Sequence, residues 1–103
     1  MILPDEFQVD DALWAEVQAA DGAEPLERDR FQRIVCEWAR ERGVPALDLL
    51  PELRAVPPWS DGRPHLYHLR DTHFNRRGNR AAGEALARFL ATFLPAPGQA
   101  DAR

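Results

Sequence analysis

An aspartate and a histidine two positions apart, Asp71 and His73, are the residues in this 103-residue chain best placed to do chemistry. A carboxylate at this spacing can hydrogen bond to one ring nitrogen and hold the imidazole in a fixed orientation. The other ring nitrogen is then free to take a proton from a hydroxyl nucleophile. The spacing therefore predicts two members of a Ser-His-Asp triad, with His73 as the base and Asp71 as the residue that orients it.

A helix is predicted to begin directly after this pair and to hold it in place. Asn75 is a good N-cap residue, and Pro95 lies where the helix should already have ended. Between them, small and aromatic residues recur every three or four positions, which indicates one face packed closely against a sheet. The residues of that face are Gly78, Ala81, Ala82, Ala85, Phe89 and Phe93.

Two more helices are predicted in the first half of the chain. Asp10 or Asp11 can cap the first, which should stop near Gly22. Pro25 should open the second helix and Gly43 should end it. The apolar face of this second helix consists of Phe31, Ile34, Val35 and Trp38.

Two strands and a long loop complete the prediction. Residues 1–4 are interpreted as the end of one strand, and the apolar run 44–50 as a second strand, parallel and covered on both faces. Asp48 interrupts this run, either as a cap for the turn that follows or as a site residue at the strand's carboxyl end. Residues 54–64 are too rich in proline for regular structure, and a turn is predicted at 60–62.

The run Asp-Thr-His-Phe-Asn at positions 71–75, followed by Gly78 and an alanine-rich amphipathic helix, resembles the last conserved block of the SGNH (GDSL-like) hydrolases. These are serine esterases and acyltransferases with a three-layer, flavodoxin-like α/β/α fold. The Asp-x-His spacing is closer to the branch that includes the alginate O-acetyltransferase-like proteins. Segments 2–9 and 43–51 resemble the sequence that precedes this block.

The resemblance implies the C-terminal part of an SGNH hydrolase fold, in which a small parallel sheet is flanked by helices. It also implies roles for individual residues. His73 matches the catalytic base and Asp71 the residue that orients it, while Asn75 and Gly78 match positions that shape the turn into the last helix.

The family's nucleophile block, its oxyanion-hole glycine block and its Gly-x-Asn-Asp block have no counterpart here. The chain has one serine, Ser60, which falls in the proline-rich loop instead of at a strand-to-helix turn. We therefore expect the C-terminal part of a larger esterase or O-acyltransferase, inactive alone, whose substrate is an acylated small molecule or carbohydrate. Residues 1–94 would belong to the hydrolase-like domain and residues 95–103 to a disordered tail. No cofactor is implied.

Two other interpretations of the same residues stay open. Four suitable zinc ligands lie close together in the sequence, so the chain could be a small metal-binding module. These ligands are His65, His68, Asp71 and His73. Alternatively, the chain is a non-catalytic interaction module in which Asp71 and His73 only cap the last helix.

Composition narrows the range of partners. The formal net charge of −4 gives no reason to expect nucleic acid or an anionic membrane as a partner. The 103 residues contain no signal-peptide pattern and no apolar run long enough to span a membrane, and they do not indicate a compartment. Because Cys36 is the only cysteine, no intrachain disulfide is expected. A two-strand sheet would expose its edge, which predicts self-association through that edge.

Overall fold

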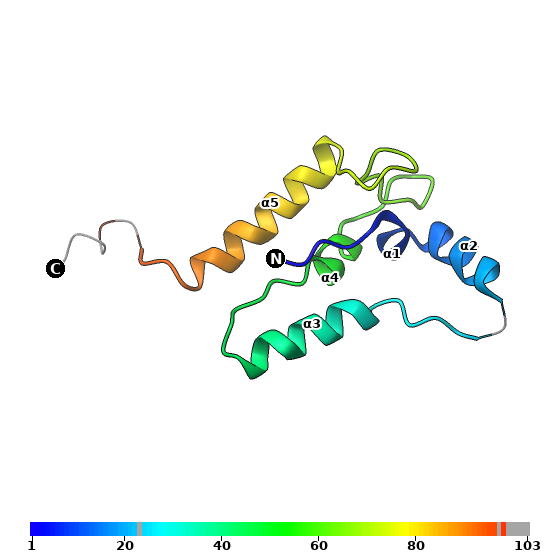
Figure 1. Cartoon of the computed structure of the whole chain (residues 1–103). Coiled ribbons are helices and arrows are strands. Elements are labelled where there is room, and N and C mark those ends of the chain that lie inside the picture. Colours follow the sequence, from blue (N-terminus) through cyan, green and yellow to red (C-terminus); the bar gives the residue numbers. More distant parts are fainter. Residues whose placement is uncertain (23, 97, 99–103) are drawn as a thin grey trace.

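The structure is a computed structural model that describes residues 1–22, 24–96 and 98 (Figure 1). This part of the chain forms five helices joined by loops, with very little β-structure. Within these ranges, β-structure is limited to two isolated bridges, a parallel one between Ile2 and Asp48 and an antiparallel one between Tyr67 and Phe74. The helices are α1 (Glu6–Val9), α2 (Asp11–Asp21), α3 (Arg30–Glu41), α4 (Leu49–Arg54) and α5 (Arg76–Ala91).

The two predicted parallel strands are reduced to a single bridge. The N–H of Ile2 donates to the Leu47 carbonyl at 2.7 Å, and the N–H of Leu49 donates to the Ile2 carbonyl at 3.2 Å. The pairing stops there because Asp48 caps α4, with its side chain accepting from the Leu50 N–H at 2.9 Å. Asp48 is thus the cap of the following turn, one of its two predicted roles.

The prediction of a three-layer α/β/α fold with a small parallel sheet is therefore wrong, since no sheet exists in the part of the chain that the structure describes. The physical reason is that a short apolar run has no periodicity that separates a buried strand from a buried helix. In the run 44–50, the last two residues begin α4 instead of extending a strand. The self-association predicted above required an exposed sheet edge. Because the described residues form no sheet, that prediction has no structural basis among them.

The structure confirms the helix caps predicted at Asp10 and Asn75. The Asp10 carboxylate accepts hydrogen bonds from the backbone two and three residues ahead, at 3.0 and 3.2 Å, and α2 follows. The Asn75 side chain accepts from the Gly78 N–H at 3.0 Å, and α5 follows. α3 begins at Arg30 and not at Pro25, because the backbone just before Arg30 forms a turn. Of the predicted tail, residues 97 and 99–103 lie outside the described residues.

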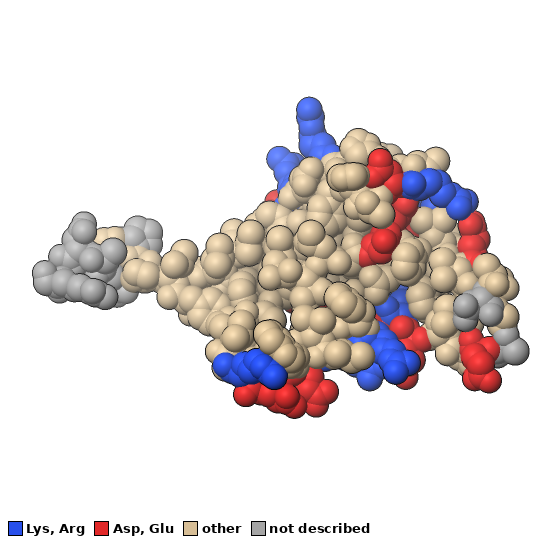
Figure 2. Space-filling view, viewed as in Figure 1, with Lys and Arg blue, Asp and Glu red and all other residues tan. Residues whose placement is uncertain are grey.

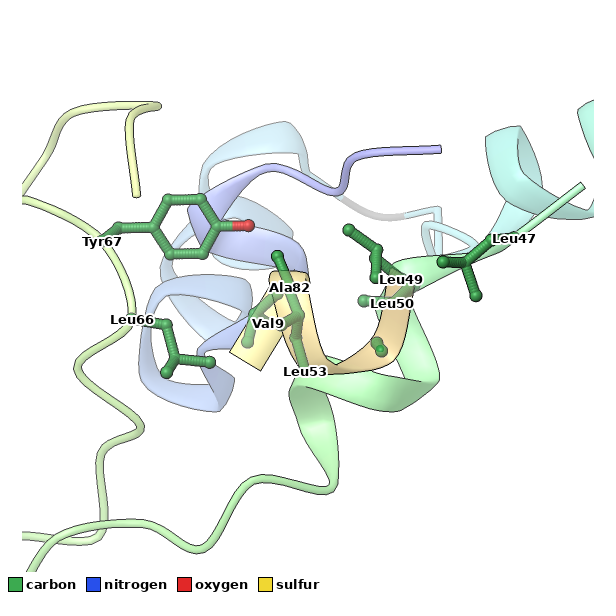
Figure 3. Close-up of a cluster of buried hydrophobic side chains, with 9 residues drawn as sticks. Val9, Leu47, Leu49, Leu50, Leu53, Leu66, Tyr67 and Ala82 are labelled. Carbon is green, nitrogen blue, oxygen red and sulfur yellow. The ribbon is translucent and has the colours of Figure 1, made fainter. Parts of the chain in front are cut away.

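The core lies where α4, α5 and the segment around Leu66 meet (Figure 3). The small-residue face of α5 is buried here, but against a loop segment instead of a sheet, with Gly78 directly against the Leu66 backbone. A Cβ atom at Gly78 would come within 2.9 Å of the Leu66 carbonyl carbon, so only glycine permits this approach. The buried cluster comprises Val9, Leu47, Leu49, Leu50, Leu53, Leu66, Tyr67, Ala82 and Ala85.

α3 lies to one side of this core (Figure 1). Its buried residues include Gln32, whose side chain hydrogen bonds to Gln8 at 3.0 Å. Its apolar face is left in solvent, with Phe31 62%, Ile34 57% and Trp38 51% exposed. The molecule measures 59 × 35 × 19 Å, and its thin dimension, about two helix diameters, leaves little depth for burying that face. Among the described residues, no helix combines the length and the apolar character needed to cross a membrane.

Candidate functional site

The predicted base and its orienting acid lie in a short hairpin that the Tyr67–Phe74 bridge closes. Inside the hairpin, the His68 N–H donates to the His73 carbonyl at 3.0 Å. Arg70, near the tip, has a φ of 57°, a left-handed conformation that lets the chain reverse tightly. The sequence placed the pair just before a helix but did not predict this hairpin.

One hydrogen bond fixes the hairpin to the N-terminal segment, and others close the base of the hairpin. The hydroxyl of Tyr67 donates to the Pro4 carbonyl at 2.7 Å in a buried position. The backbone N–H of Asn75 donates to the Leu66 carbonyl at 3.0 Å, and its side-chain amide donates to the His65 carbonyl at 2.8 Å. Burial raises the pKa of Tyr67 well above its ordinary value, so its hydroxyl remains a donor at alkaline pH as well as at neutral pH.

Asp71 and His73 form a hydrogen-bonded pair, with 2.5 Å between Asp71 Oδ1 and His73 Nδ1. The same carboxylate oxygen accepts the backbone N–H of His73 at 3.0 Å. These two bonds, the one from the ring being the larger influence, lower the pKa of Asp71. An ionised carboxylate can only accept, so Nδ1 carries the proton and Nε2 holds the free lone pair of the neutral ring.

The far side of the His73 ring is open to solvent. The side chain is 82% exposed, and Nε2 makes no hydrogen bond to any described residue. A hydroxyl approaching from outside can therefore reach Nε2 directly. Such a hydroxyl does not come from Ser60, which lies in the predicted exposed turn, where the Gly62 N–H donates to the Trp59 carbonyl at 2.8 Å. No hydrogen bond within the described ranges joins Ser60 to His73.

A cavity of about 230 Å³ opens beside the pair, and Asp71 forms part of its wall. The apolar side chains that line it are Phe7, Leu13 and Val17. Its other lining residues are mostly acidic, and burial raises the pKa of one of them, Glu6. The cavity thus offers an apolar surface for a small group, and its acidic residues disfavour an anion.

The four candidate zinc ligands are not brought together. His65 Nε2 lies 2.6 Å from Asp61 Oδ2, whereas His73 pairs with Asp71 and His68 is exposed. In the ranges that the structure covers, no group of three or more His, Cys, Asp or Glu residues is placed to hold a metal ion. The geometry gives the metal-module interpretation no support.

Asp61 and His65 form a second aspartate–histidine pair, which the sequence prediction missed. The His65 ring packs on Trp59, with 4.6 Å between ring centroids, and the Arg77 guanidinium lies 5.6 Å from the same indole. The backbone N–H of Arg63 and then the His65 ring lower the pKa of Asp61. The only sequence signal was an aspartate four residues before a histidine in a proline-rich loop, which is weak. These contacts hold the loop together.

Comparison of the chain with protein-family models, with curated proteins and with solved structures found no match. The function is therefore inferred from the geometry of the Asp71–His73 pair and its surroundings.

Proposed function

We propose that Asp71 and His73 are the acid–base half of a site for ester hydrolysis or acyl transfer, and that the hydroxyl nucleophile comes from outside residues 1–103. The observation that carries the proposal is the 2.5 Å hydrogen bond between Asp71 and His73 Nδ1, which leaves Nε2 facing solvent. A histidine held in this way is the usual general base for a hydroxyl nucleophile.

The chemistry of each step follows from the two ring nitrogens of His73. Nε2 takes the proton of the hydroxyl as the hydroxyl oxygen attacks the ester carbonyl carbon. The Asp71 carboxylate stabilises the imidazolium, which then gives its proton to the leaving alcohol oxygen. Water, or an acceptor alcohol in acyl transfer, then gives a proton to Nε2 as it attacks the acyl carbon. The imidazolium returns that proton to the nucleophile's oxygen as the bond between this oxygen and the acyl carbon breaks.

The neighbouring cavity supports a substrate class. Its volume of about 230 Å³ and its apolar contacts with Phe7, Leu13 and Val17 suit a short acyl group. Its acidic residues disfavour an anionic substrate. We therefore propose an uncharged acylated small molecule or carbohydrate as the substrate.

An activated aryl ester reacts without a hydroxyl nucleophile from the protein, so its hydrolysis tests His73 as the base directly. We expect slow hydrolysis of p-nitrophenyl acetate that depends on His73 and that Asp71→Asn reduces roughly tenfold. Alkyl esters should not be turned over by the chain alone. His68→Ala is the matched control, because His68 is also exposed but lies outside the Asp71 pair.

Two results of this assay would contradict the proposal. Equal rates for the wild-type chain, His73→Ala and His68→Ala would show that His73 is not a special base. Loss of the rate on Ser60→Ala, with His73→Ala unaffected, would place the chemistry elsewhere. If the wild-type chain and both histidine variants gave equal rates, the result would favour the second candidate function, an interaction module without chemistry. The exposed apolar face of α3 also supports that candidate.

A further inference from the structure

Phe7 lies between the cavity beside the Asp71–His73 pair, here called the hairpin cavity, and a larger groove next to α3. Phe7 and Val17 line the hairpin cavity of about 230 Å³. The same two side chains line the α3 groove, an open hollow of about 680 Å³. A side chain that lines two neighbouring hollows separates them, so Phe7 and Val17 form a wall. The other apolar residues of the α3 groove are Trp14, Pro25, Leu26, Phe31 and Ile34.

Contacts of α1 hold the Phe7 ring in this position. The ring stacks on Trp14 of α2, with 6.3 Å between the ring centroids and 20° between the ring planes. The next residue, Gln8, donates hydrogen bonds to the Arg28 carbonyl at 2.8 Å and to Gln32 at 3.0 Å. The larger half of the wall therefore belongs to a helix that is fixed both to α2 and to the start of α3.

The hairpin cavity has a polar side and an apolar side. On the polar side, Arg70 Nη2 lies 3.2 Å from Glu16 Oε2, an ion pair that joins the hairpin to α2. Figure 2 shows acidic and basic side chains together over this part of the molecule, at the upper right. The apolar side consists of Phe7, Leu13 and Val17. A hydrocarbon chain that enters beside the hairpin follows the apolar side, because contact with the ionised groups would cost them hydration.

We propose that Phe7 sets the length of the acyl group, so that the site accepts short acyl chains and rejects long ones. This inference rests on the proposed function, because it names the substrate of the same site. The hairpin cavity is smaller than the range of about 300–1,000 Å³ usual for pockets that hold drug-sized ligands. A long chain that follows the apolar side meets the wall, although apolar space lies directly beyond it. Removing the Phe7 ring should join the hairpin cavity to the α3 groove.

A series of p-nitrophenyl esters tests the wall through the ester reaction. For the wild-type chain, kcat/KM should fall from the acetate to the octanoate, after each value is divided by the rate constant of free imidazole with the same ester. Phe7→Ala should raise the octanoate-to-acetate ratio about tenfold, since the added methylene groups then gain apolar contacts in the α3 groove. Val17→Ala, a smaller change in the same wall, should raise the ratio about threefold.

Phe31→Ala is the matched control, because it removes an aromatic ring from the α3 groove without opening the wall. Phe31 lines the α3 groove but not the hairpin cavity, and it is 62% exposed. Its loss should leave both the fold and the octanoate-to-acetate ratio unchanged. Far-ultraviolet circular dichroism checks that every variant keeps its helices, and Val17→Ala carries the test if Phe7→Ala does not fold.

Binding of 1-octanol, an uncharged alkyl chain, tests the wall without any chemistry. Two-dimensional NMR of the isotope-labelled chain should show that 1-octanol binds about tenfold more tightly to Phe7→Ala than to the wild-type chain. The saturable shifts should then extend to the indole N–H of Trp14, which lines the α3 groove. The shorter 1-butanol should bind both proteins equally.

The two assays separate this inference from the proposed function. If ester hydrolysis does not depend on His73 while octanol binding still responds to Phe7→Ala, the proposed function fails and the wall remains.

Three results would overturn the inference. The first is an octanoate-to-acetate ratio and an octanol affinity that stay at their wild-type values in folded Phe7→Ala and Val17→Ala. The second is a wild-type chain that already prefers the octanoate to the acetate. The third is an equal rise of the ratio in Phe31→Ala, which would mean that the long chain lies along the outer surface and does not pass through the wall.

Discussion

The hydroxyl of Tyr67 donates a hydrogen bond to the carbonyl of Pro4 at 2.7 Å, and this buried bond joins two residues 63 positions apart. Tyr67 begins the hairpin that carries Asp71 and His73. Pro4 lies just after Ile2, which forms the parallel bridge to Asp48. One side chain thus fixes the position of the proposed base relative to the N-terminal segment.

Raising the pH above 10 should destabilise the fold through Tyr67, the only tyrosine in the chain. Burial raises its pKa in the folded state, whereas in the unfolded chain a tyrosine ionises near pH 10. The contribution of Tyr67 to the free energy of unfolding is therefore fully present below about pH 10 and is lost as the pH rises further. Tyrosinate absorbance should appear only as the helical circular dichroism signal is lost.

Tyr67→Phe is the control for this alkaline transition. It should remove the Tyr67 contribution to the pH dependence and lower the free energy of unfolding at pH 7 by about 1–3 kcal/mol, because the Pro4 carbonyl loses its donor. Ionisation of Tyr67 near pH 10 in the still-folded chain would contradict the buried hydrogen bond.

The carboxyl group of Asp71 should titrate at lower pH than that of an ordinary aspartate. The hydrogen bonds from the His73 ring and from its backbone N–H favour the ionised form. Any stabilisation from this shift is present above about pH 4 and is lost as the pH falls through the lowered pKa of Asp71. Carbon-13 NMR of the side-chain carboxyl measures it directly. His73→Ala should move the pKa of Asp71 back up, and an unchanged titration curve would mean that the pair is broken in solution.

Gly78 and Gly83 of α5 should respond in opposite ways to alanine. At Gly78 a Cβ atom meets the Leu66 backbone, so Gly78→Ala should lower the free energy of unfolding by about 1–3 kcal/mol. At Gly83 nothing lies within 4 Å of the added atom, so Gly83→Ala should raise it by about 0.5–1 kcal/mol through better helix propensity. Urea denaturation measures both. Equal effects would show that α5 does not pack on Leu66 as described.

Asp10→Ala should be one of the most damaging substitutions of a charged residue in the chain. The Asp10 carboxylate is buried, caps α2 and accepts two N–H groups of the Arg63 guanidinium, at 2.9 and 2.7 Å. We expect a loss of about 3 kcal/mol in the free energy of unfolding. Asp29→Ala is the comparison, because Asp29 precedes α3 without a side-chain cap bond and its ion-pair partner among the described residues is the exposed Arg33. Its effect in the same urea titration should stay under about 0.5 kcal/mol.

Features decided by neighbouring residues were predictable from the sequence. The caps at Asp10, Asp48 and Asn75 depend on a side chain and an N–H only two or three positions apart. The contact of Asp71 with His73 is equally local, because a spacing of two brings the side chains together whenever the backbone turns. The spacing does not decide the catalytic role of the pair, which stays a prediction.

Features decided by distant residues were not predictable. The prediction of a sheet failed because the pairing of Ile2 with Asp48 had to compete with the cap of α4, and nothing within the run 44–50 reveals which of the two wins. The bond from Tyr67 to Pro4 and the anchoring of Arg63 on Asp10 also leave no local trace. A tyrosine in a loop and an arginine near a proline look like ordinary surface residues in a sequence.

Hydrogen bonds made by Gln8 of α1 join this helix to α3 and to the residues just before α3. The Gln8 side chain donates to the Arg28 carbonyl at 2.8 Å and to Gln32 at 3.0 Å, and its backbone carbonyl accepts from the Arg28 side chain at 2.7 Å. The buried residues of α3 are the polar Gln32 and the small Ala39, whereas the core cluster buries several leucines. We therefore expect α3 to open at a lower free-energy cost than the core cluster. Its amide protons should exchange earlier than those of α5, and the connections on either side of it are where a protease would cut first.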